Sequence, residues 1–276
     1  MKRRRFCTHH FAVAGVIEAL LLVALVAIVI STIQLIYIPQ IMEQREAEHM
    51  DQVSNQLSTL KAMMDMQAIT QSDVPITSMI TLGSRELPYF ITARSFGEIS
   101  IQNLDDSYIS IDYAIPGGPF YYELTSLRFK SYNAYFVDQI YALEGGSIIV
   151  KQENGQSVMR ADPSISVDTI GDIDIHLKLP ILVDTPGKNS TQGLGKCFIR
   201  TNYSEGDSDS IGNVNSIYIA TQYPNAWNES FYNLLGDEVN YEKGEDYVEI
   251  TWKSDPLNVI IEYYYIKVQI GPGWIK

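Results

Sequence analysis

The hydrophobic and polar positions of the chain follow three successive patterns. Residues 11–38 are almost entirely apolar, with Glu18 as their single charged side chain. Residues 39–72 carry apolar side chains at spacings of three and four, and residues 73–276 carry short apolar or alternating runs separated by Gly, Pro, Asn and Asp. These patterns predict a membrane-spanning helix, a second helical segment and a domain of many short strands.

The apolar run of residues 11–38 exceeds the roughly 20 residues that a helix needs to cross a bilayer. Four basic residues stand at positions 2–5, and the positive-inside rule places that end in the cytoplasm. A cleaved signal peptide is the alternative, but its apolar core would span only about 7–15 residues and end at small residues. We therefore predict a cytoplasmic segment at 1–10, a retained single-pass helix at 11–38 and an extracellular remainder.

Glu18 is the exceptional residue of the apolar run, because a carboxylate inside hydrocarbon costs several kcal/mol unless it is neutralised or partnered. It lies about two turns into the run. One interpretation is a carboxylate near the cytoplasmic interface of the membrane. The other is that Glu18 pairs with a positive group on a neighbouring subunit in an assembled helical bundle.

Residues 39–72 are predicted to continue the helix outside the membrane as a stalk, because strong helix formers dominate and no Gly interrupts them. Pro39 is expected to mark a kink at the membrane surface. A single apolar stripe of about two heptads follows, and it consists of Met50, Val53, Leu57, Leu60 and Met64. This stripe needs a partner surface, which is either another chain in a coiled coil or the β domain of the same chain. Together with Glu18, it forms the predicted assembly site.

The remainder of the chain, residues 73–276, predicts a β-rich domain. One helix is expected at 225–235, where apolar residues recur at helical spacing. The strands are expected at 98–103, 108–114, 124–131, 139–144, 147–152, 157–160, 173–182, 196–203, 216–220, 247–252 and 259–270. The predicted fold class is therefore α+β: a long transmembrane and stalk helix followed by an all-β, sandwich-like domain packed against the end of the helix.

Charge separates the two ends of the chain and restricts its partners. The sequence holds 20 basic and 33 acidic residues; without the four basic residues at 2–5 and Glu18, 16 basic and 32 acidic residues remain, a net charge of −16. Such a surface repels phosphate backbones, and we predict no nucleic-acid partner.

The topology puts Cys7 and Cys197 on opposite sides of the bilayer, so the domain must be stable without a disulfide between them.

The sequence contains no nucleophile elbow, phosphate loop, zinc-type Cys/His spacing or dinucleotide fingerprint. We predict no enzymatic activity, no cofactor and no metal site. The acidic segment at 205–212 begins like a calcium loop, but Ile211 stands where an oxygen ligand is required, so a flexible acidic turn is expected instead. Three sequons in the predicted extracellular part make Asn189, Asn202 and Asn228 candidates for glycosylation.

The N-terminal layout carries a family resemblance. The basic start, the segment Ala-Val-Ala-Gly-Val-Ile-Glu-Ala-Leu-Leu-Leu at 12–22, the long apolar helix and the β-rich head resemble archaeal type IV pilin-like and archaellin-like surface proteins. The segments at 45–50, 80–83 and 141–146 are similar to an uncharacterised group of methanogen and halophile membrane-anchored proteins. Type IV pilins usually keep a glutamate at the fifth mature position, and counting back from Glu18 places that cut between Val13 and Ala14, which does not resemble a pilin peptidase site.

The resemblance implies a non-enzymatic surface protein of structural or adhesive function, held in the cell membrane or in a filament by its N-terminal helix. Its expected partners are the lipid bilayer, further copies of the chain or envelope proteins. The alternative is an uncut single-pass membrane protein with an extracellular binding or sensor domain that contacts the envelope or an S-layer. A membrane-tethered hydrolase is a third hypothesis.

Overall fold

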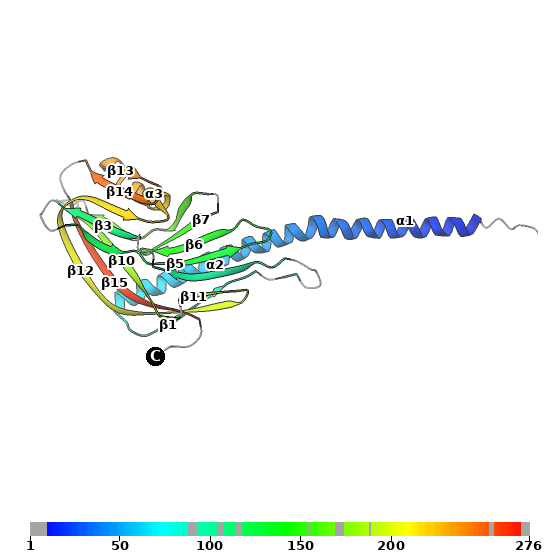
Figure 1. Cartoon of the computed structure of the whole chain (residues 1–276), viewed down its shortest axis with the longest axis horizontal. Helices are drawn as coiled ribbons and strands as arrows, with labels where there is room; N and C mark the ends of the chain where they lie inside the picture. Colours follow the sequence, from blue (N-terminus) through cyan, green and yellow to red (C-terminus); the bar gives the residue numbers. More distant parts are fainter. Residues whose placement is uncertain are drawn as a thin grey trace, which may run out of the picture.

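The computed structural model describes residues 10–84, 86–87, 93–103, 107–113, 118–153, 155–168, 174–187, 189–253 and 257–271. In these residues one long helix leads into a β-rich head (Figure 1). The helix consists of α1 (His10–Thr32), a π-helical turn η1 (Ile33–Tyr37) and α2 (Ile38–Thr70). The predicted α+β fold, with an N-terminal helix and a β domain, is confirmed.

The turn η1 lies just before Pro39, where a kink was expected. In it the amide of Ile38 donates to the carbonyl oxygen of Ile33, five residues earlier. Proline has no amide hydrogen and cannot complete the usual bond to the fourth preceding carbonyl. A wider π turn is one way in which a helix accommodates this loss, so the helix continues past Pro39 and ends at Thr70, before Gln71 adopts a left-handed conformation (φ 48°).

The described strands form two sheets. The nine-stranded sheet contains β1 (Ile76–Thr81), β3 (Tyr108–Tyr113), β4 (Phe120–Glu123), β9 (Ser164–Asp168), β10 (Asp174–Asp184), β12 (Lys196–Ala220), β13 (Val239–Lys243), β14 (Tyr247–Trp252) and β15 (Leu257–Ile270). The six-stranded sheet contains β2 (Phe96–Gln102), β5 (Ser126–Tyr132), β6 (Gln139–Glu144), β7 (Ser147–Gln152), β8 (Ser157–Ala161) and β11 (Ser190–Gly193). A short helix α3 (Pro224–Leu235) and a single 3-10 turn η2 (Gly236–Glu238) follow β12.

The hairpin between β6 and β7 shows why its sequence folds as predicted. Its central residues Gly145 and Gly146 have φ values of 54° and 77°. Positive φ at both central residues is what a type I′ turn requires, and its twist matches that of the two strands. The turn also lies close to the core, because a Cβ at Gly145 would come within 3.0 Å of the ring of Trp227.

Strand β12 corrects one prediction from the sequence. The segment at 205–212 is not a flexible acidic turn but the middle of this strand, where residues 205–211 pair with residues 259–265 of β15. Register shifts between Tyr203 and Glu205 and between Ile211 and Val214 let the strand bend without ending. The strands expected at 196–203 and 216–220 are consequently the two ends of one long strand.

Two hydrophobic cores lie on opposite faces of β15. Val259 and Ile261 belong to a core that includes helix α3, here called the α3 core. Tyr264, Ile266 and Val268 belong to a second core that includes helix α2, the α2 core. Because successive side chains of a strand point to opposite faces, odd-numbered residues of β15 face one core and even-numbered residues face the other.

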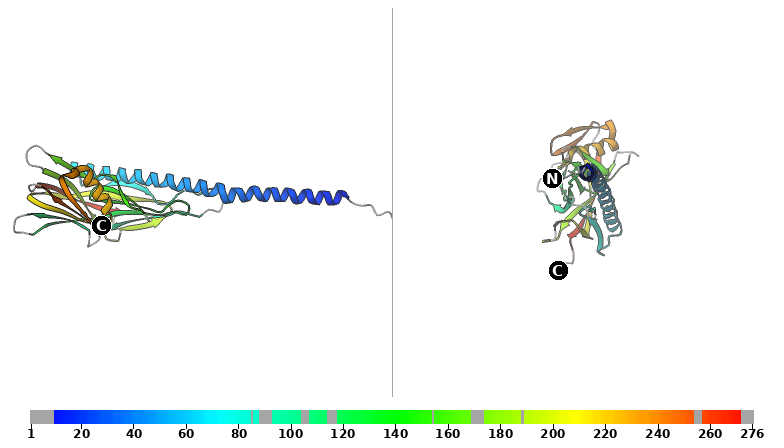
Figure 2. Two further views of the ribbon diagram at one scale, coloured as in Figure 1. Left: turned by 90° about the horizontal axis from the view of Figure 1, so that it is seen from above. Right: turned by 90° about the vertical axis from the view of Figure 1, so that its right-hand side faces the viewer.

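Helix α2 is part of the head, whereas α1 is not. The left view of Figure 2 shows α1 projecting from one end of the head while α2 lies along the strands. The α2 core joins this helix to both sheets, with residues from β1, β12 and β15 on one side and from β2, β5, β6 and β7 on the other. The segment predicted as a stalk is therefore a central element of the head.

Candidate functional site: the apolar helix and its junction with the head

Helix α1 presents apolar side chains on all sides. The large apolar residues between Val16 and Ile30 are 44–66% exposed, namely Val16, Ile17, Leu20, Leu21, Leu22, Val23, Leu25, Val26, Ile28, Val29 and Ile30. The described helix is long and apolar enough to cross a membrane once. Full burial of one such side chain contributes roughly 1.5–3 kcal/mol, so leaving the whole set in water costs at least as much as the roughly 5–15 kcal/mol that stabilises an entire domain.

The apolar stripe of α2 packs against the chain's own β domain. Met50 and Met64 are 2% exposed, and Val53, Leu57 and Leu60 are fully buried in the α2 core. Of the two partner surfaces that the sequence left open, the structure shows the intramolecular one. Burial of five such side chains stabilises the junction by roughly 7–15 kcal/mol before entropic costs are counted.

Polar side chains fix the register of α2 against the strands. Gln67 donates to the carbonyl oxygens of Val74 and Thr201, both at 2.9 Å, and accepts from the Thr201 hydroxyl at 2.8 Å. Gln56 makes a paired contact with Thr81, accepting from its amide at 2.9 Å and donating to its hydroxyl at 3.1 Å. Because these partners are fixed in direction, a rotation or slip of the helix would break them together.

Glu46 binds the loop between β5 and β6 through its carboxylate. It accepts hydrogen bonds from three consecutive backbone amides, those of Ala134 at 3.1 Å, Tyr135 at 2.7 Å and Phe136 at 2.7 Å. Glu46 itself is completely buried. A concave run of amides is a favourable site for an anion, and here the helix supplies that anion.

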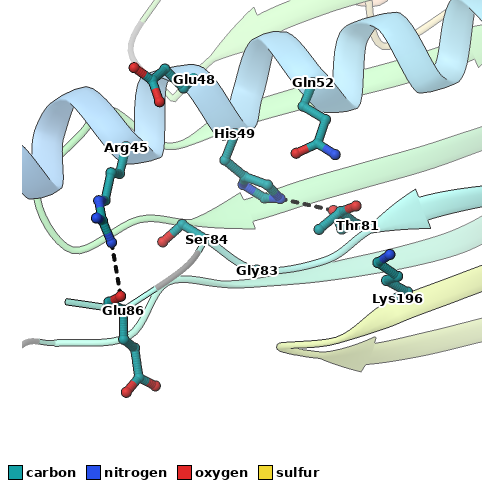
Figure 3. A pocket seen from close by; sticks show the side chains of 9 residues that line it. All are labelled: Arg45, Glu48, His49, Gln52, Thr81, Gly83, Ser84, Glu86 and Lys196. Carbon is teal, nitrogen blue, oxygen red and sulfur yellow. Dashed lines mark hydrogen bonds between the residues drawn. The ribbon is translucent and has the colours of Figure 1, made fainter. Parts of the chain in front are cut away.

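A polar pocket of about 680 Å³ opens beside this junction (Figure 3). It is lined by Arg45, Glu48, His49, Gln52, Thr81, Gly83, Ser84, Glu86 and Lys196. The side chains of Arg45, His49 and Gln52 point from α2 toward the strands, whereas Glu48 points to the other side of the helix (Figure 3). Arg45 donates to the carbonyl oxygen of Glu86 at 2.8 Å and His49 contacts the carbonyl oxygen of Thr81 at 2.9 Å.

The lining of this pocket is suited to hydrogen bonding with a small polar molecule. Both signs of charge are present, and Nε2 of His49 is directed to a backbone carbonyl and not to the hydroxyl of Ser84. Burial lowers the pKa of His49, against smaller opposing effects of the Thr81 carbonyl and Glu46, and so favours the neutral ring. Among the described residues no group of His, Cys, Asp and Glu is arranged to hold a metal ion.

A second buried carboxyl group, Glu144, lies at the end of β6. Its Oε1 accepts from the hydroxyl of Thr221 at 2.6 Å and from the indole N–H of Trp227 at 3.0 Å. Burial raises its pKa, and the two hydrogen bonds oppose that effect only in part. Glu144 and Trp227 are 1% and 0% exposed, so this group joins strands and helix α3 inside the head and is closed to a substrate.

The remaining predicted residues are dispersed. Glu18 is exposed on α1, and its proposed pairing with another subunit stays a prediction. Asn189 is exposed beside β11, whereas Asn202 in β12 and Asn228 in α3 are partly buried. Their accessibility makes Asn189 the best placed of the three glycosylation candidates, and the modification itself stays a prediction.

Glu46 and Gln67 were missed by the sequence reasoning, although a signal was present. The stripe at 50, 53, 57, 60 and 64 has alternating spacings of three and four, and one further step at each end reaches these two polar residues. A polar residue in line with a buried stripe indicates a specific hydrogen-bond partner.

The comparisons with family models, curated proteins and solved structures find no match for this chain.

Proposed function

We propose that this chain is a pilin-like cell-surface structural or adhesion protein, anchored or assembled through its N-terminal apolar helix. The observation that carries the proposal is the division of one helix into two environments. Its first half is apolar and exposed on all sides, whereas one face of its second half is buried in the core of the head.

Because exposing α1 to water is costly in free energy, this helix is expected to lie in an apolar environment. Lipid tails and the α1 helices of further copies both supply such a surrounding. The head, in contrast, has a core of its own and exposes most of its charges. A chain with these two parts is suited to hold a folded head at a membrane surface or on a filament.

The distribution of charge supports an extracellular head. Basic residues at positions 2–5 precede the apolar run, and positive residues are retained on the cytoplasmic side. The proposed partners are therefore the bilayer on the side of α1, and copies of the chain or envelope components on the side of the head.

Cysteine labelling of intact cells tests the membrane topology. In a background of Cys7→Ser and Cys197→Ala, one variant carries Val158→Cys, because Val158 is 52% exposed on the head. The matched variant carries Arg5→Cys before the apolar run. We expect a membrane-impermeant maleimide to label the first variant on intact cells and the second only after permeabilisation. The reverse pattern, or recovery of the chain in the soluble fraction, would contradict the proposal.

A second experiment separates anchoring from assembly. Surface material sheared from cells is examined by electron microscopy, and the N-terminus of the purified chain is determined by mass spectrometry. Filaments that contain the chain with a shortened N-terminus support assembly by a pilin-type pathway. A chain that stays with the membrane and keeps Met1 supports the uncut anchor.

A further inference from the structure

The end of the head remote from α1 carries a solvent-facing sheet surface of unusual composition. Ile109, Ile217 and Val248 point into the α3 core, so their strand neighbours point outward. These outward residues, here called the acidic tyrosine face, include Tyr108 and Asp112 of β3, Tyr121 and Glu123 of β4, Tyr218 of β12, Glu242 of β13, and Tyr247 and Glu249 of β14. Figure 1 shows β3, β13 and β14 at the end of the head opposite to α1.

The four tyrosines form a continuous row across these strands. The ring centroids of Tyr121 and Tyr108 are 5.6 Å apart, those of Tyr108 and Tyr218 are 6.0 Å apart, and those of Tyr218 and Tyr247 are 5.2 Å apart. The hydroxyl of Tyr247 donates to Glu242 at 2.9 Å. Among the outward positions of these paired residues there is no Lys or Arg, so the surface is aromatic and negatively charged.

The six-stranded sheet carries a surface of opposite charge. Leu127, Phe129 and Tyr141 point into the α2 core, and the alternate residues of the same strands face the other way. Beyond the part of this second face that the α3 core covers, the sheet presents Arg128 and Lys130 of β5 and Lys151 of β7, here called the cationic face. One carboxylate, Glu98 of β2, lies on this face in register with Lys130 and accepts a hydrogen bond from Tyr132. Lys130 and Lys151 stand in one row across the sheet, both in register with Ile140 of β6.

The cations of this face are arranged beside aromatic rings. The ammonium of Lys130 lies 4.6 Å from the ring centroid of Tyr132, and that of Lys151 lies 6.0 Å from the centroid of Tyr223. Nε of Arg128 is buried and has no hydrogen-bond partner within the described part of the chain. A chain of net charge −13 thus keeps three cations together on one sheet.

We propose that the acidic tyrosine face of one copy of the chain docks on the cationic face of a second copy. The two faces are complementary in charge, and tyrosine rings and carboxylates both attract ammonium and guanidinium groups. Because they are different surfaces of one molecule, each copy can use both at once, and the contact is head-to-tail and extends into a row. This inference rests on the proposed function. If α1 holds many heads at one surface, the docking of copies is the lateral contact between those heads.

The size of the acidic tyrosine face determines where the contact can be observed. Five paired strands span about 19 Å, and the outward positions along each strand span about 13 Å. A surface of this size is well below the roughly 800 Å² per partner of a stable complex. The contact is therefore weak between free molecules and becomes effective when a membrane raises the local concentration of heads.

Carbodiimide cross-linking tests the contact, because this reagent joins only a carboxylate and an amine that touch. Unlabelled and ¹⁵N-labelled full-length chains are mixed in detergent and reconstituted together into phosphatidylcholine vesicles. We expect cross-linked peptides of mixed isotope label that join Lys130 or Lys151 to Asp112, Glu123, Glu242 or Glu249. The internal control is the pair Lys178 and Glu262, which lie 3.0 Å apart in one chain and must link without mixing of labels.

Charge reversal tests the specificity of the contact. The double variant Lys130→Glu/Lys151→Glu is expected to lose the mixed-label links at least about threefold, as is Asp112→Lys/Glu249→Lys. A mixture of the two variants is expected to restore them, because each then supplies the face that the other has lost. Lys267→Glu makes the same kind of charge change at an exposed residue outside both faces and should leave the yield unchanged.

The outcomes separate this inference from the proposed function. Absence of mixed-label links while the Lys178–Glu262 link is present would overturn the docking of copies, and so would charge-reversed variants that keep the control link and the wild-type yield. In cell membranes, links from the acidic tyrosine face to lysines of a different protein, with none between copies, would overturn it too. Flotation of the chain with the vesicles reports separately on membrane anchoring.

Discussion

Gln67 of helix α2 and Thr201 of strand β12 exchange two hydrogen bonds across 134 residues of sequence. The Gln67 amide donates to the Thr201 carbonyl at 2.9 Å, and the Thr201 hydroxyl donates to Gln67 Oε1 at 2.8 Å. Both residues are 1% exposed. This pair ties the last turn of the long helix to the longest strand of the head.

The first prediction concerns this pair. Gln67→Ala leaves the buried carbonyls of Val74 and Thr201 without their donor, and we expect the free energy of unfolding to fall by about 2–4 kcal/mol. Chemical denaturation of the full chain in detergent measures it. Met66→Ala, at a neighbouring residue that is 63% exposed, should change it by less than about 0.5 kcal/mol. Equal effects of the two variants would refute a structural role for Gln67.

The second prediction concerns the apolar stripe. Leu57→Ala removes a fully buried side chain from the α2 core and is expected to lower the free energy of unfolding by about 2–5 kcal/mol. Since the stripe packs within one chain, the midpoint of thermal unfolding should not depend on protein concentration. The exposed neighbour Thr59→Ala is the control. A midpoint that rises with concentration, and no longer does so in Leu57→Ala, would instead indicate a coiled coil between chains.

The third prediction concerns pH and Glu144. Burial raises the pKa of this carboxyl above its ordinary value of 4.5, so the folded chain binds its proton more tightly than the unfolded chain. The stability contributed by the protonated form is complete below pH 4.5 and is lost as the pH rises through the folded pKa. Glu144→Gln keeps the oxygen that accepts from Thr221 and Trp227 and should abolish this loss. If the stability of Glu144→Gln fell with rising pH as that of the wild type does, the pH dependence could not be assigned to Glu144.

The fourth prediction concerns His49, for which the free energy of unfolding changes with pH in the opposite direction. Burial lowers its pKa below the ordinary value of 6.5, so in acid the unfolded chain takes up a proton that the folded chain resists. Stability is therefore complete above about pH 6.5 and falls as the pH drops toward the folded pKa. His49→Gln should remove this fall, whereas Gln52→Asn, on the same pocket wall, should retain it. The free energy of unfolding, measured between pH 5 and 8, distinguishes the two variants.

The fifth prediction concerns Glu18. If this carboxylate pairs with a positive group of a neighbouring subunit, Glu18→Gln should insert into the membrane as the wild type does but assemble several-fold less well, because a neutral amide cannot form the ion pair. Assembly is measured as the fraction of chain in sheared, pelletable surface material. Glu43→Gln, an exposed position of α2, is the control. Unchanged assembly would leave Glu18 as a carboxylate at the membrane interface.

The regular parts of the fold were predictable from local pattern. A 3.6-residue period and a long apolar run identify the helix from 10 to 70 without reference to the head, and Gly145 and Gly146 identify the turn between β6 and β7. The strands at 139–144, 147–152 and 247–252 were found with their observed limits. In each of these segments the local preference and the tertiary environment agree.

The remainder depends on contacts that are distant in sequence. The acidic middle of β12 has no local strand preference, and it is extended because β15 pairs with it. The short strands β1, β4, β9, β11 and β13 were also missed, because a run of four to six residues is too short for its pattern to identify it without the partner strand. Burial of Glu144 depends on Thr221 and Trp227, which lie 77 and 83 residues away, and no pattern around Glu144 indicates them.

The passage of one helix from α1 into the α2 core also has a mechanical consequence. Between residues 10 and 70 there is no hinge loop at which tension could be relieved. A pull on the head is transmitted along hydrogen bonds parallel to the helix axis and shared by both sheets. Detaching the head would require extraction of α2 from its core, so resistance to force is expected to be set by that packing and not by the strength of a tether.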